Sequence, residues 1–529
     1  MKRKFLEEKM KKLLKFLMAF VLAFVFTMEI SHADEDTFKV GMEVNYAPFN
    51  FSQVDDSNGA VEIKNSKGEY ANGYDVQIAK KIADRLGKKL EIYKTEWDGL
   101  PPALTSGKID AIIAGMSPTA ERKKEIDFTN SYYVSDLVVV LKKDSPFAKA
   151  KSLKDFKDAK LTGQLNTFHY TVLDQIDGLN KQSAMESFPS MISATKSGNI
   201  DGYVSEKPGA MSAVSANNDL SYVEFEKGKG FETSSEDTSI AVGLRKNSPM
   251  KDEINKILSE MNSKDQDKIM EEMVKLSEND GEKLSFFGQM KEIWSEYSSL
   301  FINGIFSTLF ISIISTIIGF FIGLVVAVIR KTNVDKNKNI IGYVLQKIIN
   351  FILAAYIEIF RGTPMMVQAI LIFYGAKQFL AIDMSTMLAA FIIVSINTGA
   401  YLAEVVRGGI NSVDEGQFEA CKALGMTHSQ TMFNVVIPQT IKSILPAIAN
   451  EFVVNIKDTS VLNVISVTEL FFVSKSIAGS TYQIFQTYLI TAIIYFILTF
   501  VTTRIILLLE RRLNNKEFVL ESATGGLNA

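Results

Sequence analysis

A short segment of the chain combines residues that together could bind a carboxylate. It runs from Ala114 to Arg122 (AGMSPTAER) and follows a predicted buried strand. Gly115 would let a ligand approach the backbone, Ser117 could cap a helix, and Pro118 suits the first helical position. A helix start offers free N–H groups to an anion, and a guanidinium one turn later would add a bidentate clamp. The segment therefore predicts a site for an α-carboxylate, while a solvent-exposed helix with an incidental arginine is the competing interpretation.

The elements around this segment alternate between β-rich and helical runs from residue 38 to residue 275. The first series predicts strands at 38–44, 90–93, 109–114 and 137–141, with helices at 74–86, 100–105 and 118–125. The second predicts strands at 160–164, 200–204 and 239–244, with helices at 169–175, 191–197 and 251–275. Such alternation favours an α/β fold with largely parallel sheets and ligands at strand ends. We predict two lobes around a cleft, lobe 1 at about 36–140 and 237–280 and lobe 2 at about 141–236.

The N-terminus has the order of a secretory signal. Seven basic residues between positions 2 and 15 precede the apolar run 16–28 and then Ser31-His32-Ala33. This order predicts a signal peptide at 1–33 with cleavage after Ala33. An uncleaved anchor is the alternative, but the run is shorter than the ~20 residues that span a bilayer. Either outcome places the two-lobed domain, residues 34–280, outside the cell.

The second half of the chain reads as a membrane domain. Uncharged runs lie at 304–329, 362–376, 384–403 and 481–503, and a more polar apolar stretch lies at 443–473. Basic residues cluster after the first, third and fifth of these runs, which five spans would place inside the cell. We therefore predict a multi-pass cell-membrane protein with a linker and interfacial segment at 281–298, about five transmembrane helices at 299–513 and a cytoplasmic tail at 514–529.

Composition and missing motifs exclude several classes of function. The 529 residues carry a net charge of −3 and a single cysteine, Cys421, so neither nucleic-acid binding, a disulfide nor a zinc site is indicated. We expect no cofactor and no metal. The sequence has no G-x-x-x-x-G-K-[ST] motif, so ATP would have to be hydrolysed by another protein. A secreted hydrolase is disfavoured because G-x-S-x-G and H-E-x-x-H are also missing.

Residues 38–275 resemble the family 3 solute-binding proteins, which deliver polar amino acids to ABC importers. The resemblance lies in residues 41–49 (GMEVNYAPF), 73–78 (GYDVQI), 97–100 (WDGL) and 198–202 (GNIDG). It implies that Tyr46 and Trp97 hold the ligand's side chain between them, with Glu43 near its far end. It also implies that Arg122 and the Ser117 amide bind the α-carboxylate. Two further contacts are implied, one from Thr167 in the second lobe and one from Glu206 to the α-ammonium.

Residues 290–513 resemble the polar amino-acid branch of the ABC importer permeases. The motif Glu419-Ala420-Cys421, three residues, Gly425, nine residues and then VVIP is similar to the EAA loop of that family. Residues 360–364 (FRGTP), 399–409 (GAYLAEVVRGG) and 457–460 (KDTS) are similar to its other motifs. The resemblance implies that the helix from Glu419 to Gly425 contacts a cytoplasmic ATPase. We expected Phe418, Cys421, Leu424 and Gly425 to form one stripe that fits a groove on this partner.

Together these features predict the binding and permease subunit of an ATP-driven importer of polar amino acids, not an enzyme. The substrate is expected to be basic (arginine, lysine or histidine), with glutamine next, because Glu43 would face a side chain between two aromatic rings. The expected partners are a separate ATPase and a second copy of this chain. The alternative is a ligand-gated ion channel with an amino-acid-binding extracellular domain, although no TVGYG-like filter occurs in the sequence.

Overall fold

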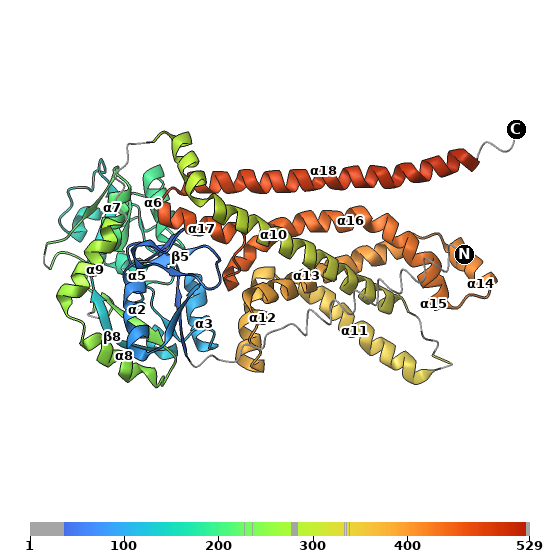
Figure 1. Ribbon diagram of the computed structural model, residues 1–529, viewed down its shortest axis with the longest axis horizontal. Coiled ribbons are helices and arrows are strands. Elements are labelled where there is room, and N and C mark those ends of the chain that lie inside the picture. The colour runs from blue at the N-terminus through green and yellow to red at the C-terminus, as the bar shows by residue number, and fades with distance from the viewer. Residues whose placement is uncertain are drawn as a thin grey trace.

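The computed structural model describes residues 36–524 except 227, 235, 277–283, 333, 335 and 338, with no side-chain description for Ser263 and residues 510–524. The predicted signal peptide lies outside the described residues, as does the linker core at 279–283. Figure 1 shows a two-lobed α/β domain at one end of the molecule and a bundle of long helices that extends away from it. The two parts are in direct contact.

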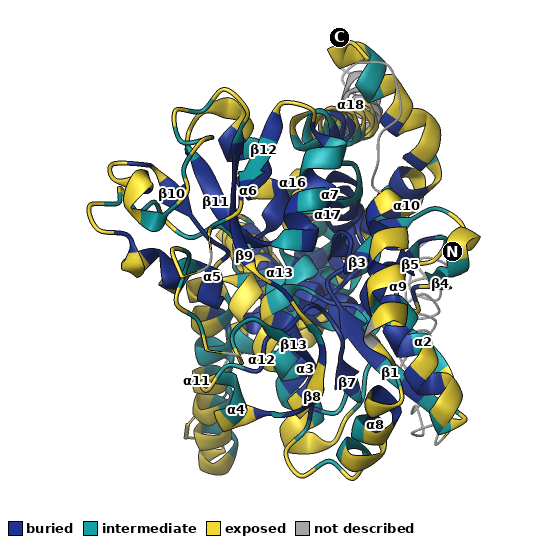
Figure 2. Cartoon of the chain, turned by 90° about the vertical axis from the view of Figure 1, so that its left-hand side faces the viewer, coloured by how far each residue is buried: buried dark blue, intermediate teal, exposed yellow. Residues whose placement is uncertain are grey.

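Lobe 1 is built on a five-stranded sheet. Its order is β6 (Lys89–Lys94), β1 (Thr37–Met42), β7 (Ala111–Ile112), β13 (Ser239–Leu244) and β8 (Asp127–Val134). Strand β1 pairs in parallel with β6 and β7, whereas β13 runs antiparallel to β7 and β8. The helices of this lobe are α2 (Tyr74–Leu86), α3 (Leu100–Thr105), α4 (Arg122–Glu125), α8 (Met250–Ser259) and α9 (Ser263–Lys275). Figure 2 shows the buried strands surrounded by helices whose outer faces are exposed.

Lobe 2 has a four-stranded sheet of its own. Its order is β10 (Leu161–Thr162), β11 (Gly202–Glu206), β9 (Leu137–Lys142) and β12 (Leu220–Val223). Its helices are α5 (Phe168–Thr171), α6 (Phe188–Ser197) and α7 (Lys207–Ala216). The chain crosses into this lobe between β8 and β9, at residues 135–136, and returns between β12 and β13. The crossing therefore lies a few residues before the predicted boundary at 140, because all of β9 belongs to the second sheet.

A third, small sheet extends lobe 1 toward the helical domain. It has the order β2 (Asn45–Tyr46), β3 (Asn50–Gln53), β5 (Tyr70–Asn72) and β4 (Val61–Glu62). All of its neighbouring strands pair antiparallel. The structure thus has mixed sheets where the sequence pattern favoured largely parallel ones, because β9 and β13, the first strands after each crossing between the lobes, run antiparallel to their neighbours.

The helical domain begins with a continuous helix, α10 (Phe286–Lys331), of 46 residues. The side chain of Ser285 caps it by accepting a hydrogen bond from the Gly288 amide at 3.2 Å. From Phe286 onward, the segment predicted as linker and interfacial region is therefore part of the same helix as the first span. A helix is stiffer than a flexible coil. The part of the connection between the two domains that belongs to α10 is therefore rigid.

Five helical segments among the described residues are long and apolar enough to cross a membrane. They are α10, α11 (Ile340–Gly362), α13 (Thr386–Asn411), the run His428–Ile465, and Ile484–Leu509 within α18 (Ile484–Thr524). The run His428–Ile465 comprises α15 (His428–Thr431), the π-helical turn η5 (Met432–Val436), α16 (Ile437–Asp458) and the 3-10 segment η6 (Thr459–Ile465). The number of spans agrees with the prediction of about five.

The identity of the second span differs from the sequence-based prediction. We expected a span at 362–376, but α12 (Met365–Leu380) has only 16 residues, and α11 takes that place instead. A 16-residue helix rises about 24 Å, less than the ~30 Å hydrocarbon thickness. Helix α12 contacts α3 of lobe 1, so it lies on the same side of the membrane as the two-lobed domain. Helix α17 (Leu470–Thr481), between the last two spans, also lies on that side (Figure 1).

Candidate ligand-binding pocket and its contacts

One pocket between the two lobes brings together all but one of the residues predicted to contact the ligand. It is lined by Glu43, Tyr46, Trp97, Gly115, Ser117, Arg122, Gln164, Thr167, Phe168, His169, Phe188 and Glu206. Ala114, the remaining predicted residue, is buried and does not line it. The cavity measures only about 10 Å³, which is roughly the space of one water molecule. The lobes must therefore separate to admit an amino acid.

Aromatic rings from both lobes close the pocket. The ring of Tyr46 stacks on Phe188 of lobe 2, with centroids 4.3 Å apart and an interplanar angle of 9°. Gly115 has a φ of +63°, and a Cβ at this position would lie 3.2 Å from the Tyr46 ring. Both the backbone conformation and the space thus favour glycine. Phe188 was missed by the sequence argument, because a phenylalanine at a helix start carries no signal of a pocket 142 residues away from Tyr46 in sequence.

Arg122, the first residue of a short helix, connects the two lobes. The predicted helix at 118–125 is reduced to α4, a single turn that begins at Arg122. The guanidinium donates to the Ser117 carbonyl at 3.0 Å and to the Asn166 carbonyl of lobe 2 at 3.0 Å. It also lies 5.1 Å from the centroid of the Trp97 ring. The predicted helix start at Pro118 is therefore wrong in position, but the guanidinium does line the pocket and can clamp an anion there.

Glu206, the last residue of β11, forms a buried polar cluster with His169. The Tyr46 hydroxyl donates to one Glu206 oxygen, and His169 Nε2 lies 2.9 Å from the other. His169 Nδ1 is 3.1 Å from the Thr167 hydroxyl. Burial by itself would raise the pKa of Glu206, but His169 and the Tyr46 hydroxyl hold it below its ordinary value. The cluster thus presents an ionised carboxylate where an ammonium could bind.

His169 was not assigned a ligand contact from the sequence, where it read as a residue at a helix start. The structure places it on the pocket wall, 4% exposed and against both Thr167 and Glu206. The sequence offered one signal for a pocket position, namely that His169 lies two residues after Thr167, a predicted ligand contact. The fold shows that His169 contacts both Thr167 and Glu206, which the spacing alone does not reveal.

Glu43 supplies a second buried carboxylate to the pocket. It follows β1, is 6% exposed and accepts a hydrogen bond from the Asn45 side chain at 3.2 Å. Burial raises its pKa to about 7, and the carboxylates of Glu96 and Asp98 act in the same direction, while Lys475 acts against them. An acidic region therefore lies on the Trp97 side of the pocket: Glu43 lines the pocket, while Glu96 and Asp98 flank Trp97 without lining it.

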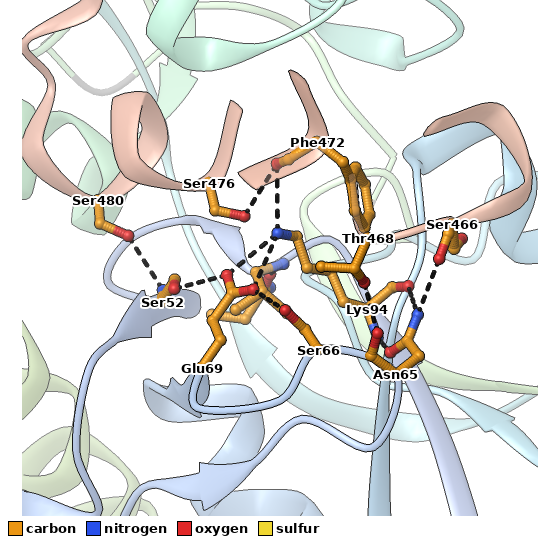
Figure 3. A network of polar contacts seen from close by, with 12 residues as sticks. Ser52, Asn65, Ser66, Glu69, Lys94, Ser466, Thr468, Phe472, Ser476 and Ser480 are labelled. Atoms are coloured by element: carbon orange, nitrogen blue, oxygen red, sulfur yellow. Dashed lines mark hydrogen bonds and ion pairs between the residues drawn. The ribbon is translucent and has the colours of Figure 1, made fainter. Parts of the chain in front are cut away.

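Lobe 1 is held against the helical domain by a buried polar network, shown in Figure 3. Lys94 Nζ lies 3.0 Å from Glu69 Oε1, and both side chains are at most 2% exposed. The same ammonium lies 3.5 Å from the Phe472 carbonyl and 4.1 Å from the centroid of its ring. The Ser52 amide donates to the Ser480 hydroxyl at 3.1 Å. A buried ion pair is costly unless its polar atoms have hydrogen-bond partners. The helical domain supplies one such partner, the Phe472 carbonyl.

A second polar contact lies farther along the interface. Asn65 donates to the Ser466 carbonyl at 3.3 Å and accepts, through its own carbonyl, a hydrogen bond from the Thr468 hydroxyl. Lys108 forms an ion pair with Asp383 at 3.1 Å. These contacts all come from lobe 1, whereas lobe 2 touches the helical domain through α6, which packs against α17 and α18. Lobe 1 is thus the more firmly held of the two lobes.

The predicted coupling helix lies at the far end of the helical domain (Figure 1). It is α14 (Glu415–Ala423), capped by the Asp414 side chain, which accepts from the Gly416 amide at 2.8 Å. Gly425 has a φ of +70°, which confirms the left-handed end of this helix. Glu419 and Ala420 are exposed.

The apolar stripe expected on this helix is divided between two environments. Cys421 is buried and Phe418 packs against the apolar cluster of α13 and α16, whereas Leu424 is 80% exposed. The first two residues therefore hold the helix to its own domain. Leu424, Glu419 and Ala420 are left free for contact with another protein.

Comparison with known proteins gives matches to both halves of the chain. Residues 38–275 match the bacterial extracellular solute-binding proteins, family 3. Residues 339–515 match the binding-protein-dependent transport system inner membrane component.

The chain is also similar to two permease proteins and one solved structure. A Rickettsia typhi permease protein assigned to a glutamine transport system is 35% identical over 40% of this chain and 92% of its own length. The arginine transport system permease protein of Bacillus subtilis is 30% identical over 41% and 93%. An amino-acid ABC transporter substrate-binding protein from Streptococcus pneumoniae, solved with L-arginine, is 26% identical, covers 46% of this chain and 97% of its own, and has a TM-score of 0.40. Nothing in these matches supports the ion-channel alternative.

Proposed function

Because the chain belongs to the binding-protein-dependent transport permeases, with a family 3 solute-binding domain fused to the membrane part, we propose that it imports basic amino acids. Arginine, lysine and histidine are the expected substrates, with glutamine next. The comparisons of both halves of the chain agree on an amino-acid ABC importer. The choice of a basic side chain rests on one observation, the acidic region formed by Glu43, Glu96 and Asp98 beside the Trp97 ring.

The pocket offers complementary partners for each part of such a ligand. Arg122 supports binding of the α-carboxylate by a charge-assisted hydrogen bond, and Glu206 supports binding of the α-ammonium. A guanidinium or ammonium at the other end of the ligand would gain an ion pair with Glu43 and a cation–π contact with Tyr46 or Trp97. A glutamine side chain would gain only a neutral-donor hydrogen bond to Glu43. The relatives include permeases of both arginine and glutamine systems, which supports both as candidate substrates.

We further propose that the energy comes from a separate cytoplasmic ATPase that binds α14, and that two copies of this chain form the pathway. The exposed residues Glu419, Ala420 and Leu424 support the first part, since they lie on a short helix at the end of the molecule away from the pocket. Closure of the ATPase would move α14 and, through Phe418, the spans α13 and α16. Opening of the pathway toward the docked binding domain would then follow.

The substitution Glu43→Gln tests the proposed substrate class. It keeps the shape of the side chain and its contact with Asn45 but removes the charge. We expect arginine and lysine to bind about tenfold more weakly, or ~1.4 kcal/mol, and glutamine to change little. Isothermal titration of the purified full chain with each amino acid measures this. Tight glutamine binding by the wild type, with no response to arginine, lysine or histidine, would contradict a basic substrate.

Arginine binding should also depend on pH in a direction set by Glu43. Burial raises the pKa of Glu43 to about 7, so the carboxylate is increasingly protonated as the pH falls below 7. A cationic ligand requires the ionised form, and arginine should therefore bind about tenfold more weakly at pH 6 than at pH 8. Glutamine should show a flatter profile, because its neutral side chain does not require the ionised carboxylate of Glu43. The difference between the two profiles should disappear in Glu43→Gln.

A further inference from the structure

A lysine of the membrane domain reaches the acidic region of the ligand pocket. Lys475, on α17, forms an ion pair with Glu96, the residue that precedes Trp97. The side chains of Lys475 and Glu96 are 16% and 13% exposed. The contact therefore lies inside the interface between the domains, where charges are weakly screened by salt.

The same face of α17 continues along the segment after β1 that carries Glu43. Gly479, one turn after Lys475, packs so closely on lobe 1 that a Cβ there would lie 2.6 Å from the Cβ of Asn45. Asn45 in turn donates its side-chain hydrogen bond to Glu43 at 3.2 Å. Farther on, the Tyr482 hydroxyl donates to the Ala47 carbonyl at 3.4 Å. These contacts fix α17 beside the acidic end of the pocket and leave Lys475 directed at it.

Electrostatics agree with this placement. Burial would lower the pKa of Lys475, but Glu96 and Glu43 together hold it above its ordinary value. Lys475 is therefore a cation at neutral pH, and it acts on the same carboxylates that would attract the side chain of a basic ligand.

We propose that Lys475 of α17 competes with the cationic side chain of the ligand for the carboxylates of Glu96 and Glu43, and so weakens binding of basic amino acids in the docked domain. The inference rests on the proposed function, because only a cationic ligand competes with a lysine. Helix α17 also contacts α6 of lobe 2, so the competing charge lies where the two lobes meet the membrane domain. This competition favours release of a basic amino acid from the pocket at the entrance of the pathway. Glutamine has an uncharged side chain, so Lys475 does not favour its release.

The test is equilibrium binding of radiolabelled arginine and glutamine to the full chain in lipid nanodiscs. Lys475→Met should bind arginine about tenfold more tightly than the wild type and glutamine within about twofold of it. Lys475→Arg, which keeps the charge, should resemble the wild type. Lys377→Met is the matched control, because Lys377 is also a cation of the membrane domain near the interface, 2.7 Å from Asp383. It should change neither affinity.

Each outcome decides the matter. Unchanged or weaker arginine binding by Lys475→Met, with normal glutamine binding, would overturn the competition. Loss of both ligands in Lys475→Met and in a second variant, Lys475→Gln, would show that the residue serves docking and would equally overturn it. If the wild type ignores arginine, lysine and histidine, the proposed substrate class fails first, and that result is visible before any variant is measured.

Discussion

Replacement of Arg122 by alanine should weaken binding of the ligand by about 30-fold or more while the protein stays folded. The guanidinium is the cation that lines the pocket beside Ser117. Its loss leaves the α-carboxylate desolvated and without a charged partner, which typically costs ~2 to 5 kcal/mol. It also removes the hydrogen bond to the Asn166 carbonyl that links the lobes. Titration calorimetry on the full chain measures the change.

Two comparisons make this result specific to the pocket. Arg85→Ala removes a guanidinium of the same lobe whose partner is the surface residue Glu260, at 2.6 Å. An exposed ion pair of this kind contributes little, so Arg85→Ala should bind normally. Arg122→Lys keeps the charge but not the bidentate geometry and should fall between the wild type and Arg122→Ala. Near-normal affinity of Arg122→Ala would remove the carboxylate clamp from this site.

Substitutions in α14 should abolish uptake without affecting the pocket. Glu419→Lys reverses an exposed charge, and Gly425→Asp places a charged side chain where φ is +70°. Neither residue contacts the two-lobed domain, so binding of the ligand should stay normal. Contact with the ATPase should fail, because the exposed face of α14 would be altered or displaced. The expected result is near-background uptake of labelled arginine by cells that carry the chain with its ATPase.

A substitution outside α14 provides the control. Lys336 is exposed in the connection between α10 and α11, so Lys336→Glu reverses a charge away from the proposed contact. It should retain most of the uptake at equal expression. Normal uptake by both Glu419→Lys and Gly425→Asp would exclude α14 from the coupling between ATP hydrolysis and transport.

The sequence was sufficient to predict a helix or strand where all the residues that mark it lie within that element. The helix predicted at 74–86 is α2, because it combines a helical apolar period with Gly87 at its end, and the strand predicted at 239–244 is β13, because it is a short continuous apolar run. The two predicted helices at 169–175 and 191–197 are also present, in slightly longer form. By contrast, the long helix predicted at 251–275 is divided at residues 260–262, where Asn262 caps the start of α9.

Hydropathy was less reliable where polar residues fall within a span. Helix α11 contains Gln346, Lys347 and Asn350, which interrupt its apolar run, so this stretch was not among the predicted spans. In the structure Gln346 donates to the Ile329 carbonyl at the end of α10 and to Asn350. Side chains paired in this way can lie near a membrane boundary at reduced cost. Only packing between helices reveals that pairing.

The sequence by itself determined the class of protein and most of the pocket. Motifs with fixed spacing mark backbone turns and charged side chains, and these are local properties of the chain. Tertiary structure alone decided which distant residues complete the pocket, His169 and Phe188, and which lysine of the membrane domain pairs with Glu96 near it, Lys475, 432 positions after Glu43. The physical reason is that a buried charge acts on whatever packs against it, and packing partners are set by the fold of both domains together rather than by any local pattern.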